Sequence, residues 1–278
     1  MSKHVISILP LAALLTVAAV AASEAAQAQQ RHLDYEREDW CERAHDNNRG
    51  DRAVYCEVRE ETLAAGREVI VVDGSPNGGI AITGWDRDEI LVQARVTAHA
   101  RSEDEAEDLA TQVEIDYGNT IRADGPRSRR RSHWSVSYRI FAPRESNLHL
   151  ETVNGGIHIS EINGGIDFET TNGGVDLYAL SGDVRGRTTN GGVHVELAGE
   201  SWDGAGMDVQ TTNGGIHITV PDGYSAHLET GTVNGGMRVD FPIIVQGRFG
   251  RTLSTDLGNG GQTIRATTTN GGIEIRRS

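Results

Sequence analysis

A short repeat in the second half of the chain is the feature that most limits its possible folds. From Glu151 to Val195 the sequence divides without a gap into five nine-residue units, ETVNGGIHI, SEINGGIDF, ETTNGGVDL, YALSGDVRG and RTTNGGVHV. In most units the seventh and ninth residues are apolar and the eighth is polar, as in a strand with one buried face. We therefore expect an all-β repeat protein.

The Asn-Gly-Gly tripeptide is the constant part of the repeat. It occupies the same place in four of the five units and returns later with longer spacers, so that segments such as 198–206 and 242–255 are expected to be insertions between units. Glycine has the backbone freedom that a tight turn needs, and asparagine tolerates similar conformations. We predict structural turns at Asn77, Asn154, Asn163, Asn172, Asn190, Asn213, Asn234 and Asn270.

Two folds fit this pattern. In an antiparallel meander, each Asn-Gly would form a two-residue type I′ hairpin turn. In a single-stranded β-helix, or β-solenoid, each unit would be half of a coil of about eighteen residues, with strands stacked ~4.8 Å apart and Asn154, Asn172 and Asn190 aligned as an amide ladder. The second glycine of the tripeptide exceeds what a hairpin needs but suits a corner at which backbones stack closely. It therefore favours the solenoid, with the meander as the alternative.

The region before the repeats is expected to contain further strands and one helix. Alternating apolar residues and turn signals predict strands over 69–72, 80–83, 90–97, 113–117 and 135–142. Ser102 and Glu105 have the spacing of a helix capping box. We predict that residues 68–145 form an N-terminal β region that caps a solenoid of residues 146–278, because an uncapped strand stack would leave open edges.

The N-terminus has the pattern of a secretory signal peptide over residues 1–28. Lys3 and His4 precede an apolar run over 5–22, and Ala26-Gln27-Ala28 suits cleavage after Ala28. No later segment is apolar enough for a membrane-spanning helix. We predict an exported protein, in the periplasm or at the cell surface, with a single N-terminal anchor as the alternative.

The segment over 29–67 is polar and holds both cysteines of the chain, Cys41 and Cys56. An isolated close pair in an exported protein predicts a disulfide, whereas a redox role would favour a Cys-x-x-Cys spacing. Arg49-Gly50-Asp51 is the tripeptide of integrin ligands, but three residues in a polar, turn-rich loop arise easily by chance.

Several motifs together resemble a known family. They are Asn77-Gly78-Gly79 followed by I-A-I-T-G-W-D, the acidic helix, the Y-R-I-F-A-P-R segment at 138–144 and the N-G-G-[IV] repeats. From about Glu68 to the C-terminus the chain is similar to a bacterial family of unknown function labelled putative adhesin, whose relatives include the heads of autotransporter adhesins. The resemblance implies a β-helix, and it implies no catalytic residue.

One set of outward-facing residues has the residue types of a metal site. In a stacked coil, His158, Asp176 and His194 would be neighbours ~4.8 Å apart, which would suit zinc or nickel, and His217 could extend the column. The equivalent positions of other units hold Asp167, Arg185, Arg238 and Glu274. This variation is more typical of a solvent-facing position, so we predict no metal and no cofactor. A calcium-binding nonapeptide repeat is excluded because Ile or Val follows the glycine pair.

A polysaccharide-cleaving enzyme of the β-helix type is the catalytic alternative. The residue types that it needs are present at Asp167, Glu169, Asp176, Arg185 and Arg187. Alternating charges on an outer strand face are also what solubility requires, and nothing in the pattern singles these residues out. Trp85 and Trp202 could stack on sugar rings, although packing at an edge or a cap is the commoner role.

Charge narrows the classes of partner. The net charge of -14 disfavours nucleic acid and anionic membrane surfaces. The one concentrated basic segment, residues 127–131, is either a solvated loop or a site for phosphate groups of an envelope polymer. We predict a non-catalytic envelope protein, an adhesin or scaffold, that binds a polymer, a glycan or a protein surface. The sequence specifies no particular ligand and no oligomeric state.

Overall fold

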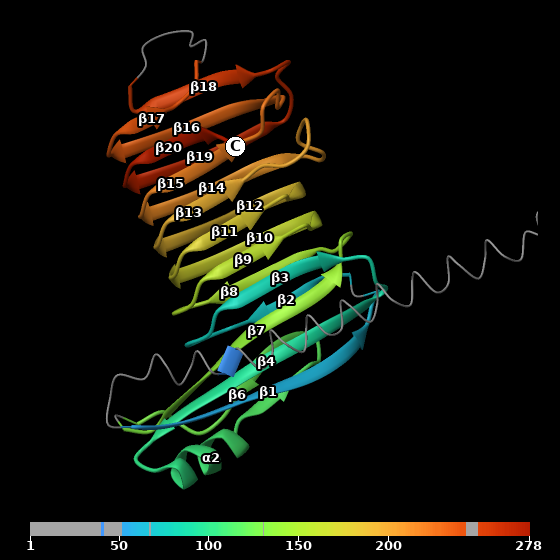
Figure 1. Cartoon of the computed structure of the whole chain (residues 1–278), viewed down its shortest axis with the longest axis vertical. Coiled ribbons are helices and arrows are strands. Elements are labelled where there is room, and N and C mark those ends of the chain that lie inside the picture. The colour runs from blue at the N-terminus through green and yellow to red at the C-terminus, as the bar shows by residue number, and fades with distance from the viewer. Residues whose placement is uncertain (1–39, 42–51, 67, 130, 243–249) are drawn as a thin grey trace, which may run out of the picture. The chain divides into compact units, whose positions relative to one another are not determined.

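The computed structural model describes residues 40–41, 52–66, 68–129, 131–242 and 250–278. The chain divides into two compact units, Met1–Gly50 and Asp51–Ser278, and the second contains all of the described strands. Within it, the strands stack one above another, and the repeats form the part coloured yellow to red (Figure 1). The predicted signal peptide, its cleavage site after Ala28 and Arg49-Gly50-Asp51 lie outside the described residues.

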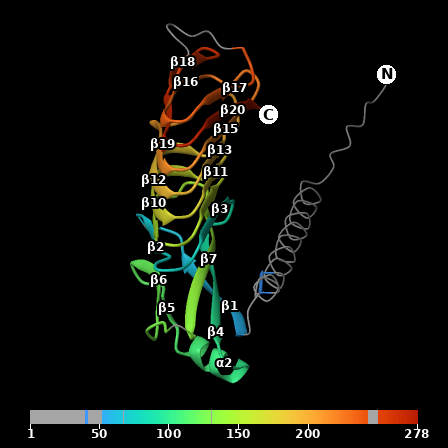
Figure 2. The ribbon, with the colours of Figure 1, turned by 90° about the vertical axis from the view of Figure 1, so that its left-hand side faces the viewer.

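Two sheets build the second unit, and Figure 2 shows them edge-on. The first sheet has the strand order β1 (Ala53–Ala64), β4 (Glu89–Ala100), β7 (His133–Pro143), β3 (Ile80–Trp85), β9 (Ile157–Ser160), β11 (Val175–Tyr178), β13 (Val193–Glu196), β15 (Ile216–Val220), β20 (Ile273–Arg277) and β17 (Met237–Val239). The second sheet has the order β18 (Thr252–Leu257), β16 (Ala226–Asn234), β19 (Thr263–Asn270), β14 (Gly206–Asn213), β12 (Ser181–Asn190), β10 (Asn163–Asn172), β8 (Leu148–Thr152), β2 (Ile70–Asp73), β6 (Thr120–Asp124) and β5 (Glu114–Asp116). With the single described helix, α2 (Glu103–Thr111), they confirm the all-β prediction.

Strands that are adjacent within a sheet come from different coils of the chain. β10 pairs in parallel with β12, with Ile166 opposite Val184, and β11 pairs in parallel with both β9 and β13. In the repeats, each strand of the second sheet except β18 is followed along the chain by a strand of the first. Parallel pairing excludes the antiparallel meander for this region and gives a solenoid-like stack.

The last coil of the chain does not lie at the end of the stack. β19 lies between β14 and β16 in the second sheet, and β20 lies between β15 and β17 in the first. The chain therefore skips one position to form β16 and β17, returns through the antiparallel strand β18, and fills the gap with its C-terminal segment. The repeat pattern does not indicate this order, because β14, β16 and β19 all end in the same Thr-x-Asn sequence.

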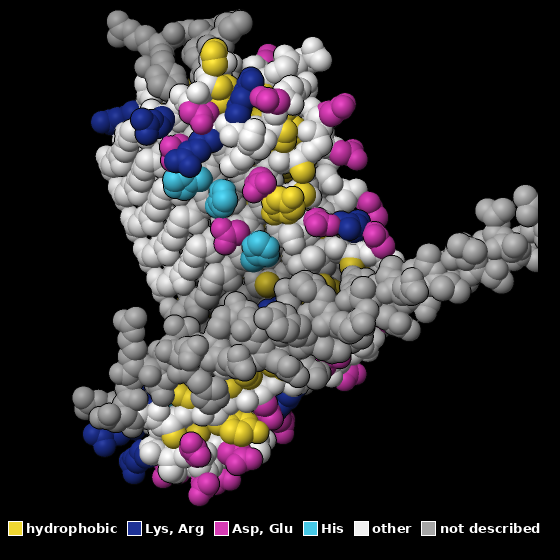
Figure 3. All heavy atoms as spheres, in the orientation of Figure 1, with side chains coloured by type: hydrophobic (Ala, Val, Ile, Leu, Met, Phe, Trp, Pro, Cys, Tyr) yellow, Lys and Arg dark blue, Asp and Glu magenta, His cyan; other side chains and the backbone are white. Residues whose placement is uncertain are grey.

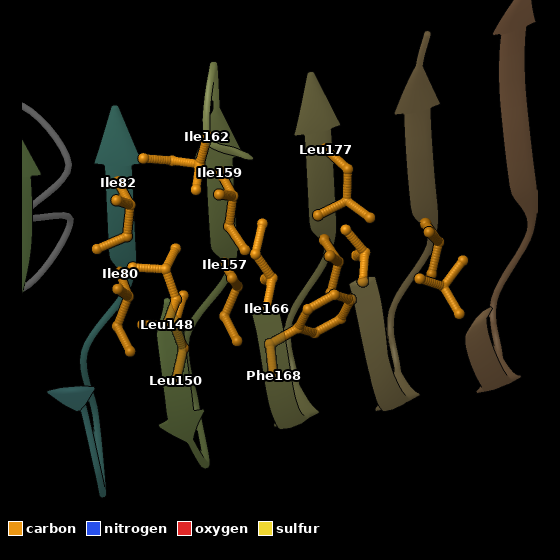
Figure 4. Close-up of a cluster of buried hydrophobic side chains, with 14 of the residues drawn as sticks. Ile80, Ile82, Leu148, Leu150, Ile157, Ile159, Ile162, Ile166, Phe168 and Leu177 are labelled. Atoms are coloured by element: carbon orange, nitrogen blue, oxygen red, sulfur yellow. The ribbon is translucent and has the colours of Figure 1, made fainter. Parts of the chain in front are cut away.

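The core lies between the two sheets. Ile157 and Ile159 of the first sheet pack beside Leu148, Ile166 and Phe168 of the second (Figure 4). All five side chains are at most 2% exposed. Burial of one such side chain stabilises a fold by ~1.5–3 kcal/mol, so the stacked apolar columns are the main source of stability.

The N-terminal region continues the same two sheets. β3 pairs in parallel with β9, and β2 with β8, so both sheets run without a break from this region into the repeats. Helix α2 begins after Ser102, whose hydroxyl accepts a hydrogen bond from the Glu105 N–H (3.3 Å), as the capping box predicted.

Strand structure begins earlier than the expected position, Glu68. β1 starts at Ala53 and pairs with β4 along its whole length. The sequence of β1 alternates only over Val54, Cys56 and Val58, and charged residues follow, because an edge strand needs one partner and one packed face. The short strand β6 lies between the strands expected over 113–117 and 135–142 and is additional to them.

Candidate functional site

Asparagine side chains form a ladder along one edge of the stack. Asn172, Asn190, Asn213, Asn234 and Asn270 each end a strand of the second sheet, and two glycines precede the next strand, which belongs to the first sheet. Each side-chain amide donates to the side-chain oxygen of its neighbour at 2.8–3.0 Å, from Asn154 to Asn77, Asn172 to Asn154, Asn190 to Asn172, Asn213 to Asn190, Asn270 to Asn213 and Asn234 to Asn270. The ladder therefore joins every coil of the repeats to the next.

Asn163 does not belong to this ladder, and the turn predicted there is wrong. It is the first residue of β10, and its side-chain amide donates to the Glu145 carboxylate (3.0 Å). The corner on this opposite edge lies between β9 and β10 at Glu161 (φ 58°), and between β11 and β12 at Ala179 (φ 51°). Neither is the Gly or Asn that a left-handed conformation favours, so no turn residue marks this corner in the sequence.

The first glycine of the tripeptide, rather than the second, is the one that close stacking requires. A Cβ added to Gly173 would lie 1.9 Å from the Gly155 carbonyl oxygen of the preceding coil. A Cβ added to Gly174 would lie 3.7 Å from the nearest atom, the Gly192 carbonyl oxygen, which is ordinary contact. At Gly156 and Gly192 the added Cβ would lie 3.2–3.3 Å from a carbonyl oxygen of the neighbouring coil, so the second glycine is also in tight contact at those corners, but the closest approach is at the first.

A ladder of buried threonines, which are not among the predicted turn residues, supports the same edge. The Thr188 hydroxyl donates to the Gly173 carbonyl oxygen of the preceding coil (2.9 Å). The same bond to a neighbouring first glycine is made by Thr152, Thr170, Thr211, Thr232 and Thr268. The signal is present in the sequence as Thr-x-Asn-Gly-Gly, and Asn163 lacks it because Glu161 stands in place of the Thr.

The outward histidines of the first sheet form a row across neighbouring strands, seen in Figure 3 as cyan side chains with a magenta side chain among them. Asp176 is the register partner of both His158 and His194, and His194 is the partner of His217. All four side chains are exposed. We call these four residues the histidine row; Glu274 and Arg238 continue it on the next two strands.

The histidine row is a line of side chains and not a cluster around one point. Nδ1 of His194 is 3.8 Å from Oδ1 of Asp176, and Nδ1 of His217 is 3.3 Å from Oε2 of Glu274. A hollow of about 300 Å³ lies beside His194, His217 and Glu274. A hydrogen bond from Arg276 lowers the pKa of Glu274, and the charges of His217 and Arg238 add to this effect. Among the described residues, no three His, Cys, Asp or Glu side chains are grouped to hold a metal ion.

Four of the five residues considered for catalysis line one open hollow of about 360 Å³ on the second sheet. Asp176 faces outward from the first sheet, whereas Asp167, Glu169, Arg185 and Arg187 lie on strands of the second. Arg187 binds Glu169 (2.7 Å) and Arg185 binds Asp183 (2.9 Å), with these side chains 43–69% exposed. The hydrogen bond to Glu169 raises the pKa of Arg187, so this side chain stays cationic. Exposed pairs of this kind are typical of a solvated strand face.

Trp85 and Trp202 are packing residues. Both are buried, and their indole N–H groups donate to the backbone carbonyl oxygens of Glu89 (2.9 Å) and Gly182 (3.0 Å). Their faces are therefore closed to a sugar ring, and the stacking role considered for them is wrong.

Both cysteines, Cys41 and Cys56, are disulfide-bonded, as predicted. The described residues accordingly include no free cysteine. No helix in the described part of the chain has the length and apolar character needed to cross a membrane.

The repeat region resembles known proteins. Residues 139–276 match the family described as Toastrack DUF4097. Among solved structures, a putative cell adhesion protein from Clostridium sporogenes is 11% identical with a TM-score of 0.47, over 81% of this chain and 100% of that chain. A putative adhesin from Bacteroides fragilis is 13% identical with a TM-score of 0.41, over 81% of this chain and 97% of that chain. No curated protein matches the chain.

The family match agrees with the resemblance to a family of unknown function. The relation to autotransporter heads stays a prediction. At such low identities, the function of this chain has to be inferred from its own residues.

Proposed function

We propose that this chain, whose repeat region matches the Toastrack family, is a non-catalytic, exported protein of the bacterial envelope that acts as an adhesin or scaffold. The histidine row carries the proposal. Each strand under it is paired with a strand on either side, which fixes the spacing between neighbouring side chains at about one strand separation, ~4.8 Å. Such a regular row fits the repeated groups of an extended partner, such as a polymer, a glycan or the surface of another protein.

The charged residues of the repeats favour binding over catalysis. A general acid and a general base have to reach the same reacting group. Here Arg185 and Arg187 are held by carboxylates of their own sheet, and Asp176 lies on the other sheet. Asp167, Glu169, Arg185 and Arg187 do line one hollow, but both arginines there are already paired, so the arrangement singles out no acid and base for a polysaccharide-cleaving reaction.

Two structural roles belong to the proposal. The Thr-x-Asn-Gly-Gly segments act as the corners that hold successive coils in register, through the two ladders at that edge. The N-terminal strands and α2 act as a cap, because β2 and β3 cover the edges that β8 and β9 would otherwise expose.

Export is tested by the fate of the N-terminus and by protease access. The full chain expressed in a bacterial host is expected to begin at Gln29 when the mature N-terminus is sequenced. Protease added to intact cells digests the protein if it is an adhesin at the surface and spares it if it is a periplasmic scaffold. Recovery of the uncleaved chain in the cytoplasm would contradict the proposal.

Binding through the histidine row is tested with two matched variants. One changes His158, His194 and His217 to Ser, and the control changes Asp167, Arg185 and Asp208, a row on the second sheet, to Ser. Retention of the mature chain on isolated envelope material is expected to fall in the first variant only. Equal retention by both would remove the role of the row, and glycan turnover that is lost on changing Asp176 or Arg185 would show an enzyme instead.

A further inference from the structure

A second candidate site lies outside the repeats, between helix α2 and the loop over 125–132. This loop links β6 to β7 and thus the second sheet to the first, where the repeats have Asn-Gly-Gly. A hollow of about 780 Å³ opens between the loop and the helix. Its volume is typical of sites that hold small molecules or part of a larger one.

Four arginines give one side of this hollow a positive charge. Arg127, Arg129 and Arg131 line it from the loop, and Arg101 lines it from the end of β4. In the described part of the chain, none of these four guanidinium groups is paired with a carboxylate, whereas most exposed arginines of the repeats are, among them Arg185, Arg187 and Arg265. Four cations around one hollow, none of them in an ion pair with a described residue, stand out in a chain with a net charge of -14.

The opposite wall of the hollow is acidic. Glu105 and Asp108 of α2 line it. Figure 3 shows the magenta side chains of this helix next to dark-blue side chains at the lower end of the view. A ligand that only carried negative charge would be attracted by the loop and repelled by the helix, so the two walls together select for a ligand with two kinds of group.

We propose that this hollow binds a phosphorylated sugar, as a free sugar phosphate or as a unit of a phosphorylated glycan. Guanidinium groups bind phosphate through paired, charge-assisted hydrogen bonds. Ionised carboxylates only accept hydrogen bonds, and sugar hydroxyls supply the donors that they need. The site lies apart from the histidine row, so that either proposal can fail without the other.

The first experiment is calorimetric titration of the mature chain with three probes, glucose 6-phosphate, glucose and inorganic phosphate, at neutral pH and low salt. Glucose 6-phosphate is expected to bind more tightly than inorganic phosphate, and glucose is expected to give no binding. Changing Arg127, Arg129 and Arg131 together to Gln is expected to lower the affinity for glucose 6-phosphate by at least about tenfold. The matched control, Arg185→Gln with Arg187→Gln, removes two paired arginines elsewhere and is expected to leave binding unchanged.

A second variant separates the two walls. Glu105→Gln with Asp108→Asn keeps the side-chain size and removes the negative charges of the two acceptors. The affinity for glucose 6-phosphate is expected to fall, whereas the affinity for inorganic phosphate is expected to stay the same or to rise. The proposal is overturned if the native chain binds no glucose 6-phosphate, if the triple Gln variant binds it as the native chain does, or if inorganic phosphate binds as tightly as the sugar phosphate. Loss of envelope binding on changing the histidine row alone would leave this site unaffected.

Discussion

The ring of Phe168 fills the space that Gly186 leaves in the next coil. The two residues are register partners on β10 and β12, and the ring is buried, at 1% exposure. A Cβ added to Gly186 would lie 2.4 Å from three atoms of the ring. The pair therefore shares one volume of the core, and the glycine in a strand interior is explained by the aromatic residue beside it.

Gly186→Ala is expected to destabilise the protein by about 1–3 kcal/mol, because the buried ring has to move off its rotamer or the strands have to separate. The free energy of unfolding from urea denaturation measures the loss. In a Phe168→Leu background the added methyl group has room, so the same change is expected to cost less, with a coupling energy of ~1 kcal/mol or more. Additive losses in the double variant would contradict the shared volume.

Adjacent glycines of one corner are expected to respond differently to the same substitution. Gly173→Ala places a methyl group 1.9 Å from the Gly155 carbonyl oxygen, where backbone has to shift, and is expected to cost about 3 kcal/mol. Gly174→Ala meets its nearest atom at 3.7 Å and is expected to be neutral or slightly stabilising, since Ala also restricts the unfolded chain. The melting temperatures of the two variants, measured by thermal denaturation under the same conditions, test this difference. Equal losses would mean that crowding is not what selects the first glycine.

The threonine ladder is tested by a replacement that keeps its shape. Thr188→Val removes the hydroxyl that binds the Gly173 carbonyl oxygen and leaves a similar volume in a buried site. The expected loss is about 1 kcal/mol in the free energy of unfolding. Thr189, the next residue, is exposed, and Thr189→Val is the matched control with an expected change within about 0.5 kcal/mol. If the two variants unfold at the same urea concentration, the hydroxyl contributes nothing to the edge.

The parts of the fold that could be predicted are those set by neighbours in sequence. The apolar residues Ile157 and Ile159, with a polar residue between them, predict which face of the strand is buried. The spacing of Ser102 and Glu105 predicts where a helix begins. Both patterns depend on local geometry. The parallel stack and the adjacency of the histidine row then followed from the repeat period.

What could not be predicted depends on contacts between distant segments. The insertion of β19 between β14 and β16 is a choice among coils with the same corner sequence, so no local signal specifies it. Ala179 adopts a positive φ because the strands on either side fix its position, against its own preference. The arginine hollow needs α2 and the loop over 125–132 to come together, and the sequence shows an acidic helix and a basic loop without indicating that they meet.

Two stacked histidines in the N-terminal region predict a loss of stability in acid. His99 and His133 are cross-strand partners on β4 and β7, with ring centroids 4.6 Å apart and planes 8° from parallel. Burial lowers the pKa of both imidazoles, the charge of Arg52 acts in the same direction on each, and His133 adds to the effect on His99. Both rings are therefore held in the neutral form that stacks.

Because the pKa values in the folded protein lie below the unfolded value of about 6.5, the unfolded chain takes up protons first as the pH falls. The contribution of the pair is thus fully present above about pH 6.5 and decreases below it until both folded imidazoles are protonated. The variant His99→Phe with His133→Phe keeps two stacked rings and removes the titration. Between pH 7.5 and pH 5.0, the free energy of unfolding from urea denaturation is expected to fall more for the native chain than for this variant. The control His158→Gln, at an exposed histidine, is expected to lose as much as the native chain. Parallel losses in all three proteins would assign the acid sensitivity to other groups.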